Sequence, residues 1–266
     1  MNIDQRAIIH PSAKIGENVS IGPFSIIGAN VELGHDCIVD AHVIIGQDTS
    51  VGPGCHIHSW AAVGTDSQDR KYHGEKAYAR VGANTVIREF VTINRGTGEE
   101  TETRIGDNCL LLAYAHVAHN CELGNGVILA NAGTLAGHVI VQDCAIIGGL
   151  VAIHQFCRVG QHAIIGGCSK VVQDVLPYSM ADGHPAILRG LNTVGLKRRG
   201  FAPEVQSALK TAFRILIRSG LSIKHAVEKI QQEYSNVTQI QDLIQFIQTS
   251  QRGICINRHV QTTDVE

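Results

Sequence analysis

The chain has 266 residues, of which 44% are hydrophobic, and its formal net charge is −2. This apolar content is sufficient for a large buried core, and the near-zero charge gives no reason to expect a nucleic acid or an anionic membrane as partner. The sequence has no run of about eighteen apolar residues and no basic, apolar leader in residues 1–6. We therefore expect a cytoplasmic protein without a membrane span.

An aliphatic residue recurs at every sixth position through almost the first two thirds of the chain. In steps of six, the series runs through residues 3–63, then 81–93 and finally 105–171. Neither a helix nor a flat sheet has this period, whereas three six-residue sides close one triangular coil of short strands. The sequence therefore predicts a hexapeptide-repeat parallel β-helix, whose handedness the period does not reveal.

Two further features of the repeat support this fold. The fourth position after each aliphatic residue is always small, so we expect it to face inward. Five cysteines occupy it and are expected to be buried free thiols: Cys37, Cys55, Cys109, Cys121 and Cys157. Glycine often follows the aliphatic residue directly, and we expect these corners to need backbone conformations that glycine adopts at low cost.

Two insertions interrupt the repeat, at residues 65–79 and 96–104. Loops on a rigid scaffold are common places for binding chemistry, and the first insertion is polar and carries both charge signs. The second insertion has no aromatic residue and almost no basic one, and we interpret it as a tolerated surface excursion.

The repeat ends near Pro177, where we expect the chain to turn helical. We therefore divide it into a β-helix over residues 1–177 and a helical domain with tail over 178–266. A first helix is predicted from Pro203 to Gly220, a second after Ser222, and a third over residues 239–251. These helices are expected to cover the end of the β-helix and partner subunits, and residues 257–266 read as a frayed tail.

Residues about eighteen apart should stack on neighbouring coils, because three sides of six make one turn. This spacing gathers four polar side chains around one glycine: His119, His138, His154 and Gln155 around Gly137. His116 lies one strand step away from this cluster. The same spacing aligns Asn131, Gly149 and Gly167 in a column with almost no side-chain volume.

The histidine cluster fits acyl transfer. An imidazole is suited to proton transfer near neutral pH, and a bare glycine N–H can hold an oxyanion. We predict that His119 takes the proton of an acceptor hydroxyl and that the Gly137 N–H binds the oxyanion. The glycine column is explained either by an acyl groove or by tight corner packing. No metal is expected, because His116 and His119 on one ideal strand would point to different faces.

Six motifs give the sequence a specific resemblance: SQDRKYHGE (67–75), IREFVTINRGT (87–97), AHVAHNC (115–121), LAGHV (135–139), GGLVAIHQF (148–156) and GLNTVGLKRRGF (190–201). Together they resemble the UDP-N-acetylglucosamine O-acyltransferase family of lipid A biosynthesis. The resemblance implies a left-handed β-helix and a homotrimer with sites between subunits. It also implies transfer of an R-3-hydroxyacyl group from acyl carrier protein to the 3-position of UDP-N-acetylglucosamine. The acyl group is attached to the phosphopantetheine of the carrier protein, so no other cofactor is implied.

The resemblance also assigns roles to individual residues. It implies that His119 is the general base and that Gly137 is the oxyanion donor, in agreement with the stacking. Residues near the sugar and the acyl chain are Asp69, Lys71, His116 and His138, and we assign His154 to substrate binding with them. Nucleotide contacts are Gln155, Asn192, Arg198 and Arg199, of which the two arginines suit a pyrophosphate. Gly167 matches the position that gauges acyl length.

Two departures from the family pattern leave alternatives open. Asn120 stands where the family usually has Asp, and an amide can orient His119 without offsetting the charge of an imidazolium. Asn94 stands where some members have histidine. The alternatives are acylation of a 3-amino sugar nucleotide, a coenzyme A-dependent acetyltransferase, and a nonenzymatic β-helical scaffold that lost activity through Asn120.

Overall fold

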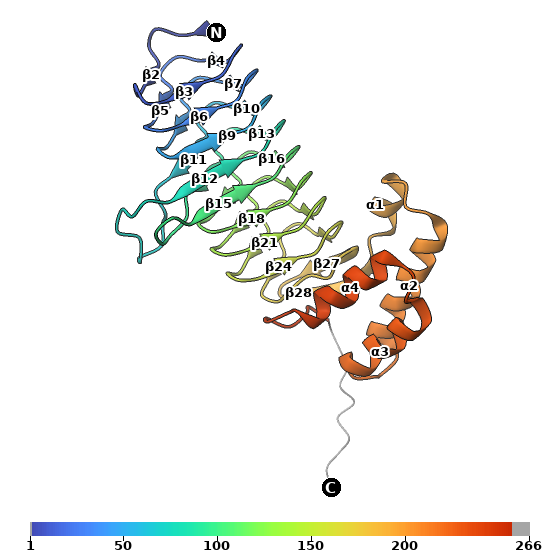
Figure 1. Cartoon of the computed structure of the whole chain (residues 1–266). Coiled ribbons are helices and arrows are strands. Elements are labelled where there is room, and N and C mark those ends of the chain that lie inside the picture. The colour runs from blue at the N-terminus through green and yellow to red at the C-terminus, as the bar shows by residue number, and fades with distance from the viewer. Residues whose placement is uncertain (1, 257–266) are drawn as a thin grey trace.

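The computed structural model describes residues 2–256, which form a left-handed parallel β-helix followed by a small helical domain (Figure 1). The strands lie on three faces, which we name A, B and C. Face A contains β1 (Asn2–Ile3), β4 (Ser20–Ile21), β7 (Ile38–Val39), β10 (His56–Ile57), β13 (Val86–Ile87), β16 (Leu110–Leu111), β19 (Ile128–Leu129), β22 (Ile146–Ile147), β25 (Ile164–Ile165), β27 (Ser179–Gly183) and β28 (Ala186–Leu191).

Faces B and C complete the triangle. Face B contains β2 (Ile8–Ile9), β5 (Ile26–Ile27), β8 (Ile44–Ile45), β11 (Ala62–Thr65), β14 (Thr92–Asn94), β17 (His116–Val117), β20 (Thr134–Leu135), β23 (Ala152–Ile153) and β26 (Lys170–Val171). Face C contains β3 (Lys14–Ile15), β6 (Glu32–Leu33), β9 (Thr49–Val51), β12 (Tyr78–Val81), β15 (Glu102–Ile105), β18 (Glu122–Leu123), β21 (Ile140–Val141) and β24 (Arg158–Val159).

The pairing of neighbouring coils confirms the repeat. His116 pairs with Thr134, which lies eighteen positions further on, and Thr134 pairs with Ala152 in the same register. The sequence separation of paired residues exceeds eighteen only where an insertion leaves the coil. Thr49, for example, pairs with Ala79 across the first insertion. Spatial neighbours elsewhere on the coil can therefore be read from the numbering.

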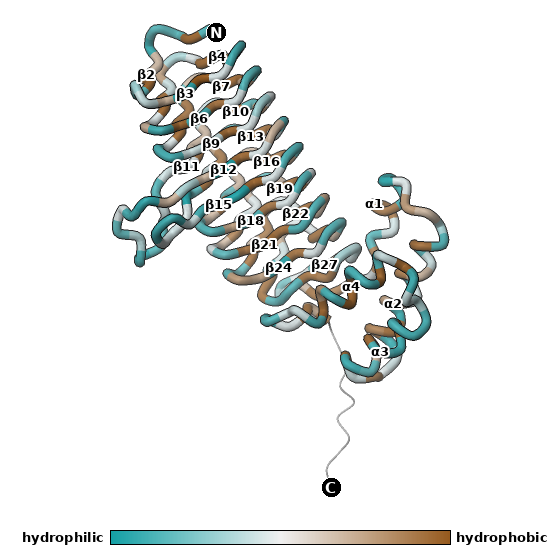
Figure 2. The backbone as a smooth tube through the Cα atoms, in the orientation of Figure 1, coloured by the Kyte–Doolittle hydropathy of each residue, from teal (hydrophilic) through white to brown (hydrophobic). Residues whose placement is uncertain are grey.

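The axial aliphatic residues and the small inward residues form one continuous core. Hydrophobic residues recur along each coil of the β-helix (Figure 2). From Val19 onward the side chains at the inward position are buried, as predicted. The five cysteines there are free, and the Cys121 thiol donates to the Ala136 carbonyl at 3.1 Å. Burial raises the pKa of Cys121 to about 12, so this thiol remains protonated and only fills space.

We expected the corner glycines to be needed for an unusual backbone conformation, and this expectation was wrong. Glycines that directly follow the aliphatic residue, such as Gly16 and Gly22, do not have a left-handed φ. A Cβ at either position would instead lie within 3.0 Å of the backbone of the next coil. The left-handed conformation occurs two positions later, mostly at other residue types such as Asn18 (φ 56°) and Trp60 (φ 69°). Close packing between coils, rather than φ, requires these glycines.

The repeat does end near Pro177, but the chain does not turn helical there. β27 and β28 form an antiparallel hairpin that extends face A to Leu191. Four helices follow within the described residues: α1 (Thr193–Arg198), α2 (Pro203–Arg218), α3 (Ile223–Tyr234) and α4 (Thr238–Gln248). The sequence did not predict α1, whereas the starts at Pro203 and Ser222 are confirmed. The predicted tail, residues 257–266, lies outside the described residues.

The helices pack against the last coils of the β-helix (Figure 1). The Arg158 guanidinium lies 4.2 Å from the centre of the Phe246 ring and donates to the Phe246 carbonyl at 2.8 Å. The Tyr178 hydroxyl donates to Asp242 Oδ2 at 2.8 Å. These contacts confirm that the helical domain covers the end of the coil. Within residues 2–256, no helix has the length and apolar character needed to cross a membrane.

Candidate active site

His119 lies in the turn between faces B and C, directly after β17. The strand ends at Val117, so His119 does not share a strand with His116 as the sequence suggested. Its side chain is only 12% exposed. Nδ1 lies 2.9 Å from Asn120 Oδ1, and Nε2 lies 3.6 Å from Asp69 Oδ2. One nitrogen is thus fixed by a neutral acceptor and the other faces a carboxylate.

Gly137 lies on the next coil, against the His119 ring. A Cβ at position 137 would come within 3.0 Å of both Cε1 and Nε2 of His119, so the ring occupies the space that any side chain would need. Within residues 2–256 the Gly137 N–H donates no hydrogen bond. The stacking predicted from the sequence is confirmed, and it places a free N–H beside the imidazole.

The second insertion holds Asn120, contrary to our interpretation of it as a tolerated surface excursion. Thr97 N donates to Asn120 Oδ1 at 3.0 Å, and Asn120 N donates to Thr103 Oγ1 at 2.8 Å. Nothing in the composition of residues 96–104 signals these contacts, because they join segments more than fifteen positions apart. The loop orients the residue that orients His119.

The first insertion supplies Asp69, and a chain of hydrogen bonds fixes its carboxylate. Asp69 N donates to Ser67 Oγ at 3.1 Å, and Lys71 N donates to Asp69 Oδ1 at 3.0 Å. Ser67 Oγ and Thr97 Oγ1 are 2.6 Å apart, which joins the two insertions. The remaining oxygen of Asp69 is therefore directed at His119.

Two more predicted histidines surround His119. His116 Nδ1 is 2.7 Å from Thr92 Oγ1, and burial, together with the nearby His119, lowers the pKa of His116. The His138 ring meets the His119 ring edge-on, with centroids 5.2 Å apart, and stacks on Phe156 at 4.8 Å. Burial and the nearby His119 also lower the pKa of His138. Both flanking rings therefore remain neutral at pH 7, where they can hydrogen-bond a neutral ligand.

The glycine column is packed less tightly than other corners. A Cβ at Gly149 would meet only Asn131 O, at 3.3 Å, and one at Gly167 would come no closer than 3.2 Å to Gly149 O. At Gly148, in contrast, it would lie within 3.0 Å of the backbone of the next coil. The looser packing of the column relative to Gly148 favours the acyl-groove interpretation.

The other predicted residues are not joined to this cluster in the single chain. His154 and Gln155 are exposed one coil further on, and Arg198 and Arg199 are exposed at the end of α1. Asn192 caps α1, with Oδ1 accepting from Gly195 N at 3.1 Å and Nδ2 donating to the His162 carbonyl at 2.9 Å. Within the described chain no hydrogen bond or ion pair links these residues to His119. Their substrate roles stay predictions.

A base and an unpaired N–H on a hexapeptide coil, with an open column nearby, define the class of hexapeptide-repeat acyltransferases. Residues 12–47 and 102–137 match the bacterial transferase hexapeptide repeat, and residues 174–255 match domain 2 of UDP N-acetylglucosamine O-acyltransferase. The acyl-[acyl-carrier-protein]–UDP-N-acetylglucosamine O-acyltransferase of Nautilia profundicola is 50% identical over 97% of this chain and 99% of its own. The enzyme of the same name from Alkalilimnicola ehrlichii is 48% identical over 95% of this chain and 98% of its own length.

Solved structures agree with these relatives. LpxA from Acinetobacter baumannii superposes with a TM-score of 0.92 at 38% identity, covering 96% of this chain and 99% of that one. LpxA from Bacteroides fragilis, a UDP-N-acetylglucosamine acyltransferase, superposes with a TM-score of 0.92 at 41% identity. The match covers 94% of this chain and 98% of that one. The chain belongs to the UDP-N-acetylglucosamine O-acyltransferase family.

Proposed function

We propose that this chain transfers an R-3-hydroxyacyl group from acyl carrier protein to the 3-hydroxyl of UDP-N-acetylglucosamine, the first step of lipid A biosynthesis. The observation that carries the proposal is His119, held by Asn120 and lying against Gly137. The relatives reported above are named as O-acyltransferases that act with acyl carrier protein and UDP-N-acetylglucosamine. The donor brings its own phosphopantetheine, so the reaction needs no separate cofactor.

In the proposed reaction, His119 Nε2 accepts the proton of the sugar hydroxyl while the hydroxyl oxygen attacks the thioester carbonyl. A C–O bond forms, and the carbonyl oxygen gains the negative charge that the Gly137 N–H stabilises. Collapse of this intermediate breaks the C–S bond, and the leaving thiolate takes the proton from His119. The ester product and a free carrier thiol result.

Asp69 provides next to His119 the negative charge that Asn120 lacks. Asn120 Oδ1 accepts a hydrogen bond from His119 Nδ1–H and fixes the tautomer, but it carries no charge. Asp69 Oδ2, 3.6 Å from Nε2, supplies a negative charge that stabilises the imidazolium formed during transfer. A scaffold that had lost its activity would have no need for this arrangement, which favours a working enzyme.

We further propose a homotrimer whose sites lie between subunits. The outward residues of faces A and B include large exposed aliphatic side chains, such as Ile38 at 44% and Ile8 at 63%. Face C instead carries ion pairs, such as Lys14 to Glu32 at 2.6 Å. A prism with two apolar faces and one charged face suits a closed three-fold assembly. A neighbouring subunit would then bring nucleotide-binding residues to His119.

The eight cysteines are all free, as expected in a reducing compartment. This supports the proposed cytoplasmic location.

The test is an assay of purified protein with 3-hydroxyacyl carrier proteins of graded chain length and UDP-N-acetylglucosamine. We expect a hydroxylamine-labile ester, because an O-acyl product is cleaved by hydroxylamine and an amide is not. Parallel reactions replace the acceptor by its 3-amino analogue and the donor by the acyl-coenzyme A. Faster transfer to the amine, or from coenzyme A, would overturn the proposal.

A further inference from the structure

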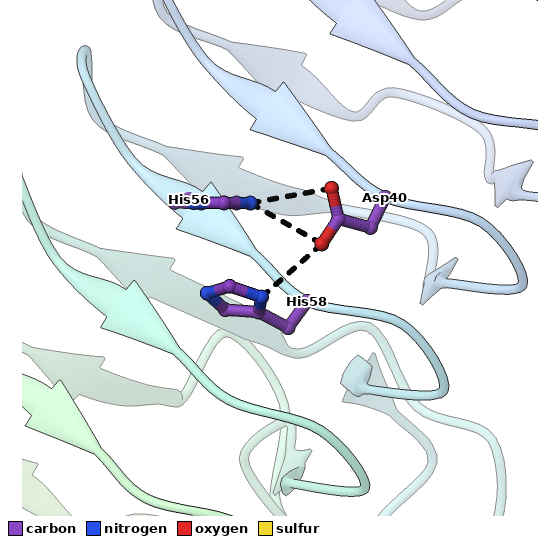
Figure 3. A group of neighbouring side chains, drawn as sticks. All are labelled: Asp40, His56 and His58. Carbon is purple, nitrogen blue, oxygen red and sulfur yellow. Dashed lines mark hydrogen bonds and ion pairs between the residues drawn. The ribbon is translucent and has the colours of Figure 1, made fainter.

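A second cluster of titratable side chains lies on an earlier part of the coil, outside the acyl-transfer site. Asp40 follows β7, His56 lies in β10, and His58 follows β10 (Figure 3). Asp40 and His58 occupy equivalent positions of adjacent coils, because His56 pairs with Ile38 in the parallel register. The fold thus brings one carboxylate and two imidazoles together from two successive turns.

The ligand atoms of these three residues converge. His56 Nε2 lies 3.2 Å from both carboxylate oxygens of Asp40, and His58 Nδ1 lies 3.1 Å from Asp40 Oδ2. One nitrogen from each ring therefore points at the same carboxylate (Figure 3). In a tetrahedral zinc site, bond lengths of about 2.0–2.2 Å place neighbouring ligand atoms about 3.3 Å apart. The nitrogen–oxygen spacings match this value, and all three ligand atoms lie within 4.8 Å of one another.

The two imidazoles of the cluster are held against each other. Their rings are stacked with centroids 3.8 Å apart, so both ring edges face Asp40 from the same side. Glu89 Oε1 lies 3.9 Å from His58 Nδ1, although Arg88 already pairs with this carboxylate at 3.0 Å. In the single chain the side chains of the cluster are between 19% and 34% exposed, which leaves access for a water ligand.

We propose that Asp40, His56 and His58 bind a zinc ion, with water as the fourth ligand. Two imidazoles with one carboxylate suit zinc, whereas magnesium and calcium prefer oxygen ligands throughout. Because the ligands come from two coils, the ion cross-links the coil of β7 to that of β10. The site stabilises the first half of the β-helix and takes no part in acyl transfer.

The proposal is tested on the whole purified protein by zinc titration calorimetry and by thermal unfolding with zinc, magnesium or no added metal. At zinc concentrations about 100 times Kd we expect the Tm to rise by about 5–10 °C. Magnesium at the same concentration should leave it unchanged. Asp40→Asn and His58→Ala should each remove one zinc equivalent per chain.

The matched control is His35→Ala. His35 Nδ1 also bonds a carboxylate, Asp36 Oδ2 at 2.6 Å, but among residues 2–256 no third ligand group joins this pair. His35→Ala should therefore keep the full zinc stoichiometry. His56→Gln provides a second test of the site if Asp40→Asn folds poorly. Equal zinc stoichiometry in the wild type and the cluster variants would overturn the proposal, as would no binding at micromolar zinc. Acyl transfer by His58→Ala should match the wild type, so this result is independent of the proposed function.

Discussion

Gly137→Ala tests the geometry of the active site most sharply, because it adds a single methyl group and keeps the N–H proposed to bind the oxyanion. The new Cβ would lie 2.5 Å from His119 Nε2, whereas ordinary contacts begin near 3.4 Å. The ring must therefore retreat by about 1 Å, and a misplacement of that size can lower kcat by about 100-fold. Because φ at position 137 is not left-handed, alanine introduces no backbone strain there.

The assay is steady-state acyl transfer, with circular dichroism to confirm folding. The matched control is Gly149→Ala at the same position of the repeat, where the new Cβ would meet only a carbonyl oxygen at 3.3 Å. Because Gly149 belongs to the glycine column, both variants are assayed with a short 3-hydroxyacyl donor, and with it we expect the control to retain kcat within a few-fold. If Gly137→Ala were as active as Gly149→Ala, His119 would not work from its observed position.

The remaining predictions concern the base, its orientation, the acyl groove and the response to pH. His119→Ala should lower kcat by at least about 100-fold with folding intact, as measured by the same assay. Asn120→Asp should remain active, and the acid limb of its kcat/KM profile should move to higher pH, because the introduced carboxylate stabilises the imidazolium. Gly167→Met should shift the donor preference several carbons shorter at constant KM for the sugar nucleotide, since each methylene denied burial costs about 0.8 kcal/mol. The free energy of unfolding should fall as the pH drops from about 6.5 through the native pKa of His116, because the native state disfavours the proton that the unfolded chain accepts. His116→Gln should reduce this slope in denaturant titrations.

Each of these predictions has a clear contrary result. Near-wild-type turnover in His119→Ala would mean that another residue is the base. An unchanged pH profile in Asn120→Asp would mean that the charge of residue 120 does not affect the pKa of the base. An unchanged chain-length profile in Gly167→Met would show that the acyl chain does not pass this position. An equal pH slope in His116→Gln would place the acid sensitivity elsewhere.

The β-helix and the contact of His119 with Gly137 could be predicted because the repeat places residues eighteen positions apart next to each other. An aliphatic residue at every sixth position specifies the coil, and the spacing of eighteen then specifies the neighbours. The same arithmetic would have found Asp40 above His58. The prediction from the sequence was confined to neighbours of the later histidines and did not include this pair.

Other features lay beyond this arithmetic. The contact between Thr97 and Asn120 depends on the path of an insertion, which no period describes. The left-handed φ values fall on residues as different as Asn18 and Trp60, so residue type does not reveal them. α1 is short, and its cap, Asn192, had already been assigned to the nucleotide through the family resemblance. A residue can hold the fold and still bind substrate, and only an assay separates the two roles.

The most direct test of the account is a single-turnover reaction of wild type and His119→Ala with 3-hydroxyacyl carrier protein and UDP-N-acetylglucosamine, followed by mass spectrometry. The account predicts that the wild type forms one ester at the sugar 3-oxygen with stoichiometric release of the carrier thiol. His119→Ala should form it at least about 100-fold more slowly. Ester formation at equal rates in the two proteins, or no acylated sugar with the wild type, would contradict it.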